Sequence, residues 1–513
     1  MHVDIEPWPA PPGVTVRPTR LGELMPVATR TDAEIGVELQ RIEQMDACLA
    51  AYKVELVSEL ARRRPDSDDR QIGEPGAASP DWLPGPGREP AAGVSEFFAD
   101  ELAIILNCSR TAATKLADQA ALLTQRMSAT WAALADGRLD WPRARAIASE
   151  LMDPARDVAP HVLAAVEAAV LPRARERSVS ALQAAVRKEL LRLDAAAADR
   201  RRKRAERSAD VTVRPAGDGM AHLSIFAPAP FVAAIHQSLD QYARTAKTDG
   251  DGRTLGQLRV GVLGDLVLRP WDETRPPVTA HLTVLASLDA LIAGATGHDG
   301  CAAGQFGPQA IGGCRWVEPA EIDGQPITAA HLRSLLEQLD ALCPGGLQAP
   351  TGGTLDIALT DPLTGALLAV VSRAELERLA GRGCPTHPDE GGGCPVLDRP
   401  PPVDRYRPTP AQRRFGKTRD RTCRHPGCRN DAAWADLDHV VPHAAGGETS
   451  CDNLCCLCRR HHRLKTHAAG WRFVMTADGV LSVTTPSGVT RTTRPPGYTG
   501  GSPPGESDDP PPF

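Results

Sequence analysis

The chain has 513 residues, of which 42% are hydrophobic, so it is long enough for two to four domains with buried cores. Its net charge of −6 argues against a protein that binds nucleic acid over its whole surface. No apolar run approaches the roughly 20 residues of a membrane helix, and the first residues lack the order of a signal peptide, so a cytoplasmic protein is expected.

The first two thirds of the chain are predicted to be mostly helical. Residues 1–30 are proline-rich and without a periodic pattern, which predicts disorder. Apolar residues at helical spacing predict a helix that starts at Thr31 or Asp32 and stops at residues 62–64, before Pro65. Prolines and glycines in residues 65–93 predict a mobile loop, and a second helical block runs from residue 94 to about 207. Residues 31–380 are therefore expected to form a mostly helical domain of unknown function.

Short strand patterns interrupt this helical domain. Residues 211–213 and 222–226 predict a hairpin, residues 354–359 and 365–371 predict a second strand pair, and two helices are expected at 230–246 and 254–267. The expected fold class is α+β: a large helical domain with a small sheet, followed by a small C-terminal module. A Gly/Pro linker (381–412), the module itself (413–495) and a disordered tail (496–513) complete the predicted organisation.

The C-terminal module is basic although the chain is acidic. Residues 413–472 contain twelve basic and six acidic residues, which leaves the rest of the chain at about −12. A basic module on an acidic chain is typical of phosphate contact, although an ordinary Arg-rich surface would give the same count. The candidate phosphate-binding residues are Arg419, Arg421, Arg459, Arg460, Arg463 and Lys465.

Six of the thirteen cysteines lie between residues 423 and 458, a crowding that favours metal binding over disulfides. Cys423 and Cys428, with Cys458 and His461, supply three thiolates and an imidazole, a ligand set that suits structural Zn²⁺. Cys455 is the alternative fourth ligand, because its spacing to Cys458 is that of a zinc ribbon. His461 is preferred because the preceding residues fit a strand or turn that leads into a helix bearing both histidines.

Further polar residues recur through the same segment: Asp438–His439, Gly446–Gly447, Asn453–Leu454 and His461–His462. The order His439, Asn453, His462, with the glycine pair between, resembles the HNH nucleases of the ββα-metal fold over residues 419–473. The whole layout also resembles actinobacterial proteins that join a helical domain of unknown function to a C-terminal HNH module. That wider resemblance rests on the patterns at residues 134–140 and 218–220.

The resemblance implies a metal-dependent endonuclease that hydrolyses DNA phosphodiester bonds. In it, His439 is the general base that activates water, and Asp438 and His462 hold one divalent ion that stabilises the leaving 3′ oxygen. Asn453 either ligates the ion or orients the backbone of the base, and the orienting role is favoured. Many relatives carry another histidine where this chain has Thr466, so two protein ligands are expected, which suits Mg²⁺ or Mn²⁺ better than catalytic Zn²⁺.

Two other functional classes remain open from the sequence. The module could be a non-catalytic, zinc-stabilised DNA-binding unit, or a protein-interaction scaffold that has lost nuclease activity. The expected partner is DNA, with no membrane, and the helical domain is a candidate for self-association or for binding a partner protein.

Overall fold

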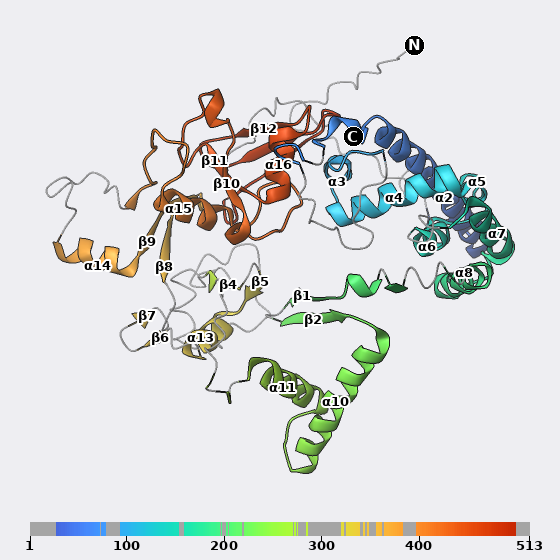
Figure 1. Ribbon diagram of the computed structural model, residues 1–513, viewed down its shortest axis with the longest axis horizontal. Helices are drawn as coiled ribbons and strands as arrows, with labels where there is room; N and C mark the ends of the chain where they lie inside the picture. Colours follow the sequence, from blue (N-terminus) through green and yellow to red (C-terminus); the bar gives the residue numbers. More distant parts are fainter. Residues whose placement is uncertain are drawn as a thin grey trace. The chain divides into compact units, whose positions relative to one another are not determined.

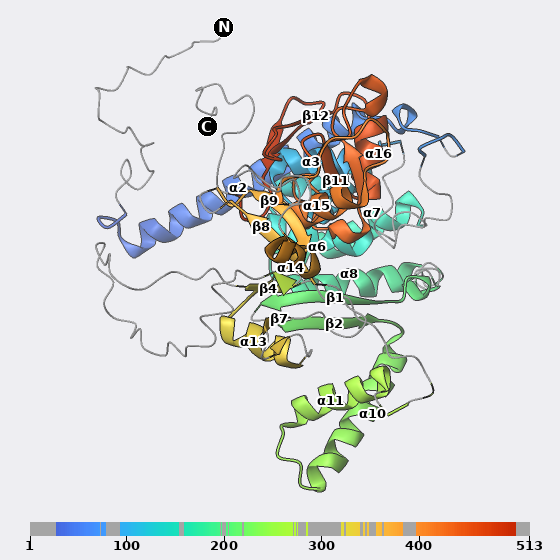
Figure 2. The same ribbon diagram turned by 90° about the vertical axis from the view of Figure 1, so that its left-hand side faces the viewer.

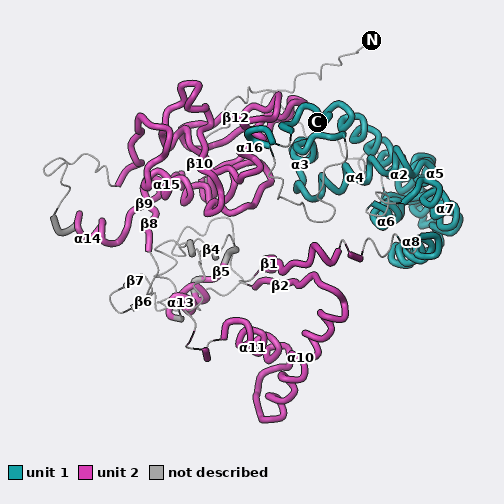
Figure 3. The backbone as a smooth tube through the Cα atoms, in the orientation of Figure 1, with its two compact units in different colours: residues 1–201 teal, residues 202–513 magenta. Residues whose placement is uncertain are grey.

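The computed structural model of the chain divides into two compact units, residues 1–201 and 202–513 (Figure 3). The structure describes residues 27–71, 73–77, 93–152, 158–194, 196, 202–203, 205–217, 220–269, 271–272, 274, 284–285, 320–322, 325–338, 342–343, 346–347, 355–361, 364–382 and 397–498. The predicted disorder at residues 1–26 and 499–513 lies outside these residues, as do most of the predicted mobile loop and the first part of the predicted linker.

Unit 1 is helical (Figures 1 and 2). Its elements are α2 (Asp32–Arg62), η1 (Asp66–Asp68), α3 (Phe98–Leu106), α4 (Arg110–Arg126), α5 (Ser128–Ala135), α6 (Trp141–Leu151), α7 (Pro160–Val170), η3 (Leu171–Arg173) and α8 (Val179–Leu193). The predicted first helix is present and ends at Arg62. Its N-cap is Thr31, whose hydroxyl accepts from the Glu34 N–H while the Glu34 carboxylate accepts from the Thr31 N–H, a capping box.

One continuous core holds unit 1 together, and two buried carboxylates tie its helices to one another. Glu101 of α3 accepts from Nε and Nη2 of Arg64, which follows α2, at 2.8 and 2.9 Å. Glu167 of α7 accepts from the backbone N–H and the hydroxyl of Thr130 in the first turn of α5, at 2.8 and 2.7 Å. Because both carboxylates are buried, these charge-assisted bonds fix the ends of the helices they join.

Unit 2 begins with the predicted hairpin and two helices. Its first elements are β1 (Asp210–Gly217), β2 (Met220–Phe226), α10 (Ala229–Thr248), α11 (Leu255–Leu268), β3 (Val284–Leu285), β4 (Ala320–Ile322), β5 (Gln325–Ile327), α13 (Ala329–Gln338), β6 (Leu342–Cys343) and β7 (Gly346–Leu347). All of their strand pairs are antiparallel, and β1 pairs with β2 from Asp210–Phe226 to Gly217–Met220.

The C-terminal part of unit 2 contains the polar segment of interest. Its elements are β8 (Asp356–Thr360), β9 (Leu367–Ser372), α14 (Arg373–Arg382), α15 (Pro410–Asp420), η5 (Ala432–Trp434), β10 (Asp436–His439), η6 (His443–Ala445), β11 (Leu454–Leu457), α16 (Arg459–His467), β12 (Arg472–Met475), β13 (Leu481–Thr484) and β14 (Thr490–Thr493). Strands β12, β13 and β14 form an antiparallel sheet after α16. The chain as described is α+β, mostly helical with small sheets.

Residues before the predicted boundary at residue 413 contact the module. Residues 397–412 were predicted as linker, but the side-chain amide of Gln412 donates to the carbonyls of Pro401 and Thr449 at 3.0 and 2.9 Å, and Val403 bridges to Thr449. The proline-rich segment thus packs on the module through its backbone: the carbonyl of Pro401 accepts from Gln412, and the N–H of Val403 donates to the carbonyl of Thr449. Leu367 of β9 and Phe415 of α15 share a small core, so the β8–β9 pair also contacts the module.

None of the described helices is both long enough and apolar enough to cross a lipid bilayer.

Candidate functional site

Two antiparallel strands and one helix carry the candidate site. Strand β10 pairs with β11 so that Asp438 lies opposite Cys455 and His439 opposite Leu454, and α16 follows β11 directly (Figure 1). Side chains two residues apart on a strand face the same side. Asp436 and Asp438 therefore project from one side of β10, the side on which α16 contributes His462.

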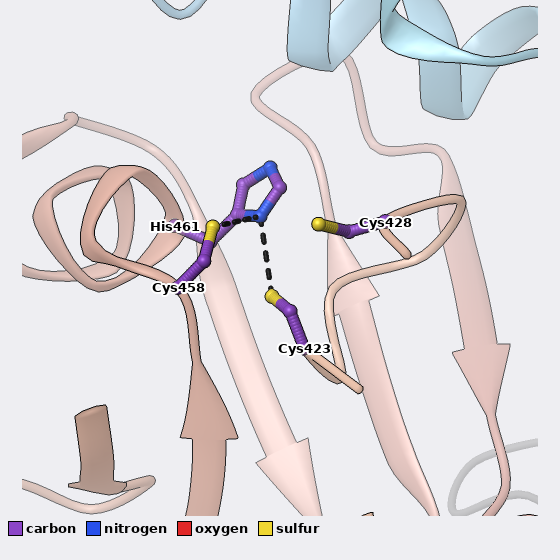
Figure 4. Close-up of side chains that lie close together, drawn as sticks. All are labelled: Cys423, Cys428, Cys458 and His461. Carbon is purple, nitrogen blue, oxygen red and sulfur yellow. Dashed lines mark hydrogen bonds between the residues drawn. The ribbon is translucent and has the colours of Figure 1, made fainter. Parts of the chain in front are cut away.

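The four predicted zinc ligands lie together (Figure 4). The three sulfurs and the imidazole of Cys423, Cys428, Cys458 and His461 lie within 4.8 Å of one another. The Nδ1 atom of His461 lies 3.3 Å from the Cys423 sulfur and 3.2 Å from the Cys458 sulfur, so Nδ1 is the nitrogen that faces the thiols. Three cysteines and one histidine at this spacing could hold a tetrahedral metal such as zinc.

Cys455, the alternative fourth ligand, is not part of this cluster. It is fully buried on β11, and burial raises the pKa of its thiol to about 12. In the cluster itself, hydrogen bonds between the thiols raise the pKa of Cys423 and lower that of Cys458. Because His461 lies in the cluster and Cys455 does not, the geometry favours His461 as the fourth ligand.

His461 and His462 face two different sites from one helix. Successive residues leave an α-helix about 100° apart. His461 is buried against the thiols, whereas His462 faces the carboxylates of β10. The helix that carries the metal cluster thus also positions His462.

The imidazole of His462 lies between two carboxylates. Its Nδ1 is 2.9 Å from Asp436 Oδ2, and its Nε2 is 3.4 Å from Asp438 Oδ1. Lys465, one turn along α16, places its ammonium 3.0 Å from Asp438 Oδ2 and so balances the charge of this carboxylate. The other oxygen, Oδ1, faces His462 Nε2, so this oxygen and this nitrogen are the pair that could hold a hard divalent ion.

His439 occupies a buried position next to this pair. Its Nε2 lies 2.7 Å from the hydroxyl of Thr449, and that hydroxyl donates its only hydrogen to the carbonyl of Arg405 at 2.6 Å. The Thr449 oxygen must therefore accept the Nε2–H of His439, which leaves Nδ1 as the unprotonated nitrogen. Burial lowers the pKa of His439, partly opposed by the charge of Asp438, so the ring is neutral near pH 7. Tyr406 stacks on the ring with centroids 5.5 Å apart.

Asn453 holds the loop between the two strands. Its amide nitrogen donates to the carbonyls of Val441 and Glu448 at 3.0 and 2.8 Å, and its amide oxygen accepts from the Val441 N–H at 2.8 Å. These contacts favour the orienting role for Asn453. The loop also requires Gly447, because a Cβ there would lie 1.9 Å from the carbonyl oxygen of Val441.

Arg419, one of the predicted DNA-binding residues, points into the module rather than to solvent. Its guanidinium is buried and donates to Asp420 and to the carbonyls of Cys451 and Leu454. Asp420 also accepts from Arg424 and from the Cys456 N–H, so this network connects α15 to β11. The count of basic residues could not show that Arg419 points inward.

The other predicted basic residues differ in exposure. Arg459 is the most open, with its side chain 78% exposed and 3.5 Å from Asp436. Arg421, Arg460 and Arg463 are half-buried, whereas Lys465 is 8% exposed and turned to Asp438. A phosphate-binding surface at this module would therefore centre on the start of α16, where Arg459 projects.

The family match concerns the N-terminal part of the chain. Residues 37–310, more than half of its length, match the family described as Domain of unknown function (DUF222). The chain belongs to this family. The DUF222 match extends across the division between the two units and ends before the Cys/His cluster begins.

Curated relatives of this DUF222 protein are named without a function. Over 82 residues it is 45% identical to Uncharacterized protein Rv3776 of Mycobacterium tuberculosis (strain ATCC 25618 / H37Rv), a match that covers 16% of each chain. It is also 45% identical over 82 residues to Uncharacterized protein MT2160 of strain CDC 1551 / Oshkosh and to Uncharacterized protein Rv2100 of strain H37Rv. The chain thus spans about a sixth of the length of these relatives. No solved structure matches it.

Sequence reasoning missed two residues of the DUF222 protein's candidate site. Asp436 holds His462 Nδ1, and Thr449 sets the tautomer of His439. The two-residue spacing of Asp436 and Asp438 on an extended segment could have indicated a shared face. No comparable signal exists for Thr449, which reaches His439 only through the fold of the intervening loop.

Proposed function

We propose that the C-terminal module is a metal-dependent HNH endonuclease that hydrolyses DNA phosphodiester bonds. The observation that carries this proposal is the pairing of Asp438 Oδ1 with His462 Nε2 at 3.4 Å, across β10 and α16, with the neutral imidazole of His439 next to Asp438 in the chain. Metal-assisted hydrolysis needs ligands for a hard divalent ion and a general base next to them. Asp438 and His462 would supply the ligands, and His439 would supply the base.

His439 is the proposed general base. Its Nε2–H is held by Thr449, so Nδ1 can accept a proton from an attacking water molecule. Its lowered pKa keeps that nitrogen unprotonated near neutral pH, and stacking on Tyr406 fixes the plane of the ring. Asn453 maintains the backbone that follows the base through its contacts with Val441 and Glu448.

Asp438 and His462 would hold the divalent ion. When bound, Mg²⁺ or Mn²⁺ would supply Lewis-acid stabilisation of the charge that develops on the departing 3′ oxygen. Asp436 accepts from His462 Nδ1 and so directs the lone pair of Nε2 toward Asp438, a support that is common for metal-binding histidines.

The Cys/His cluster would serve as a structural zinc site. Its three thiolates and one imidazole differ in kind from the carboxylate and imidazole next to it, so the two groups select different metals. Zinc there would anchor the segment around Cys423 to the start of α16 and thereby fix His462.

One observation favours the alternative, a non-catalytic zinc-stabilised DNA-binding module. The ammonium of Lys465 lies 3.0 Å from Asp438, so the buried carboxylate already has a counter-charge without any ion. In that case Asp438 and Lys465 would be a structural ion pair, and DNA would bind without being cut.

A plasmid-nicking assay separates the two functions. Zinc-loaded full-length protein with Mg²⁺ or Mn²⁺ is expected to nick supercoiled DNA, and His439→Ala, purified in the same way, should be reduced about 10²–10⁴-fold. His443→Ala is the matched control, because this nearby histidine lies 5.7 Å from the His439 ring and is half-buried. Retained DNA binding with no cleavage under either ion would favour the alternative.

A further inference from the structure

Helix α2 has two opposite apolar faces. Ala47, Ala51, Val54 and Val57 pack into the core of unit 1. The opposite side of the helix carries large apolar side chains that are between 41% and 64% exposed, namely Ile42, Met45, Leu49, Tyr52 and Leu56. A single-sided amphipathic helix needs only the first face to join its domain, so the second face is unexplained by the fold of unit 1.

The exposed face follows the heptad repeat of a coiled coil. Its residues are spaced 3, 4, 3 and 4 apart, and Ile35 lies one heptad before Ile42, with Glu38 at the seam position between them. This spacing keeps a narrow apolar seam on one side of a helix and is the pattern by which two helices pack knobs into holes. The occupant that such a seam fits is therefore another helix with the same repeat.

The first half of α2 also lacks a packed side. Ala47 is the first buried residue of the helix, fifteen residues after its start at Asp32. Figure 2 shows this N-terminal half, in blue, extending beyond the other helices of unit 1. A helical segment of about 15 residues is marginally stable alone in water, and this one exposes Leu39 as well as the seam. Its capping box stabilises the start, but apolar contacts must come from elsewhere.

We propose that the α2 seam, formed by Ile35, Ile42, Met45, Leu49, Tyr52 and Leu56, binds the same seam of a second copy of this chain in an antiparallel coiled coil. The arrangement is isologous: two copies related by a twofold axis present one surface to each other. Ile42 packs opposite the partner's Tyr52, and Met45 opposite the partner's Leu49. The proposal concerns unit 1 alone and is independent of the proposed nuclease activity.

Charge determines the direction of the two helices. In the antiparallel arrangement Arg41 lies opposite the partner's Glu55 on both sides of the axis, and one contact between the two copies of Asp46 remains at the exposed rim. In a parallel, in-register pair, Arg41 would meet the partner's Asp46 instead, but Glu38 and Glu59 would each meet their own counterpart within the seam. Like charges inside a coiled-coil seam are unfavourable, so the antiparallel direction is favoured.

Light scattering on the full-length chain after gel filtration tests the dimer. The wild type is expected at twice the chain mass of 54.6 kDa. Leu49→Asp should raise the dissociation constant at least about 100-fold, because it would place two carboxylates in the apolar seam. Val37→Asp is the matched control, since it adds the same charge to another exposed position of α2 that points away from the seam. A monomeric wild type at about 50 µM, or an unchanged mass for Leu49→Asp, would overturn the proposal.

A charge exchange tests the direction. Arg41→Glu removes the proposed pair with the partner's Glu55, together with a 4.0 Å contact to Glu38 in the same helix, and should weaken the dimer about tenfold. Adding Glu55→Arg should restore it if the helices are antiparallel. Restoration by Asp46→Arg instead would show parallel helices and overturn the antiparallel assignment.

Discussion

His462 donates from Nδ1 to a carboxylate oxygen of Asp436 at 2.9 Å, while its Nε2 faces Asp438 at 3.4 Å. Two acidic residues at alternate positions of β10 therefore hold the two nitrogens of one imidazole. The first contact sets the tautomer, and the tautomer makes Nε2 an acceptor that can share an ion with Asp438. This relationship links the geometry of β10 and α16 to the proposed chemistry.

Asp436→Asn tests that link. An asparagine can still contact His462 but removes the negative charge that stabilises its Nδ1–H, so the concentration of Mn²⁺ needed for half-maximal cleavage should rise about 10–100-fold. Zinc content should stay unchanged. Asp431→Asn is the matched control, because Asp431 caps η5 in the same module without contacting His462. Equal Mn²⁺ dependence of both variants would contradict the positioning role.

The adjacent histidines of α16 should give opposite metal phenotypes. His462→Ala is expected to retain about one zinc per chain and to lose Mn²⁺ binding, whereas His461→Ala should lose zinc, because its Nδ1 faces the thiols. Elemental analysis and Mn²⁺ titration by electron paramagnetic resonance measure the two metals separately. If His462→Ala released the zinc and His461→Ala kept it, the two roles would have to be exchanged.

The buried charge network of α15 should be important for stability. Burial alone would raise the pKa of Asp420, but the guanidinium groups of Arg419 and Arg424 lower it overall, so the carboxylate is ionised in the folded protein. Asp420→Asn would leave two buried cations without their counter-charge and should destabilise the module by about 3–5 kcal/mol in urea denaturation. Asp452→Asn, which disrupts only a partly exposed pair with Arg399, should cost at most about 1 kcal/mol. Similar losses for both variants would refute a special role for the network.

DNA binding by the full chain should weaken as the salt concentration rises. Part of this salt dependence should come from Arg459 at the start of α16. Arg459→Ala, measured without Mg²⁺ or Mn²⁺, should weaken binding equally for DNA duplexes of unrelated sequence. It should also reduce the slope of the logarithm of the binding constant against the logarithm of the salt concentration by about 1. Arg138→Ala in unit 1, an exposed arginine paired with Asp136, is the control and should leave the slope unchanged. A slope unaffected by Arg459→Ala would remove this residue from the phosphate-binding surface.

Local spacing predicted the Cys/His cluster because two close pairs, Cys423 with Cys428 and Cys458 with His461, each determine their own geometry. Only one long-range contact was then needed to join them. The Asp438–His462 pair was predicted by resemblance, and the structure places the two side chains together. The helix starting at Asp32 followed from apolar periodicity and a capping residue, both of which are local signals.

Features that depend on how distant segments meet could not be predicted in this way. The direction of the Arg419 side chain is set by Asp420 and by two carbonyls from the loop and strand more than thirty residues later. The composition of the proline-rich segment before α15 is that of a linker and predicts one. The side-chain amide of Gln412 nevertheless connects the backbone of this segment, at Pro401, to Thr449 of the module. The exposed seam of α2 has the same apolar spacing as a core face, so periodicity alone could not tell which face is buried.

The central claim is tested most directly by the products that zinc-loaded, full-length protein makes from an end-labelled DNA duplex. Cleavage that requires Mg²⁺ or Mn²⁺, yields 3′-hydroxyl and 5′-phosphate ends and falls about 10²–10⁴-fold in His439→Ala is the predicted result. Intact duplex under both ions, or equal cleavage by wild type and His439→Ala, would contradict the nuclease assignment.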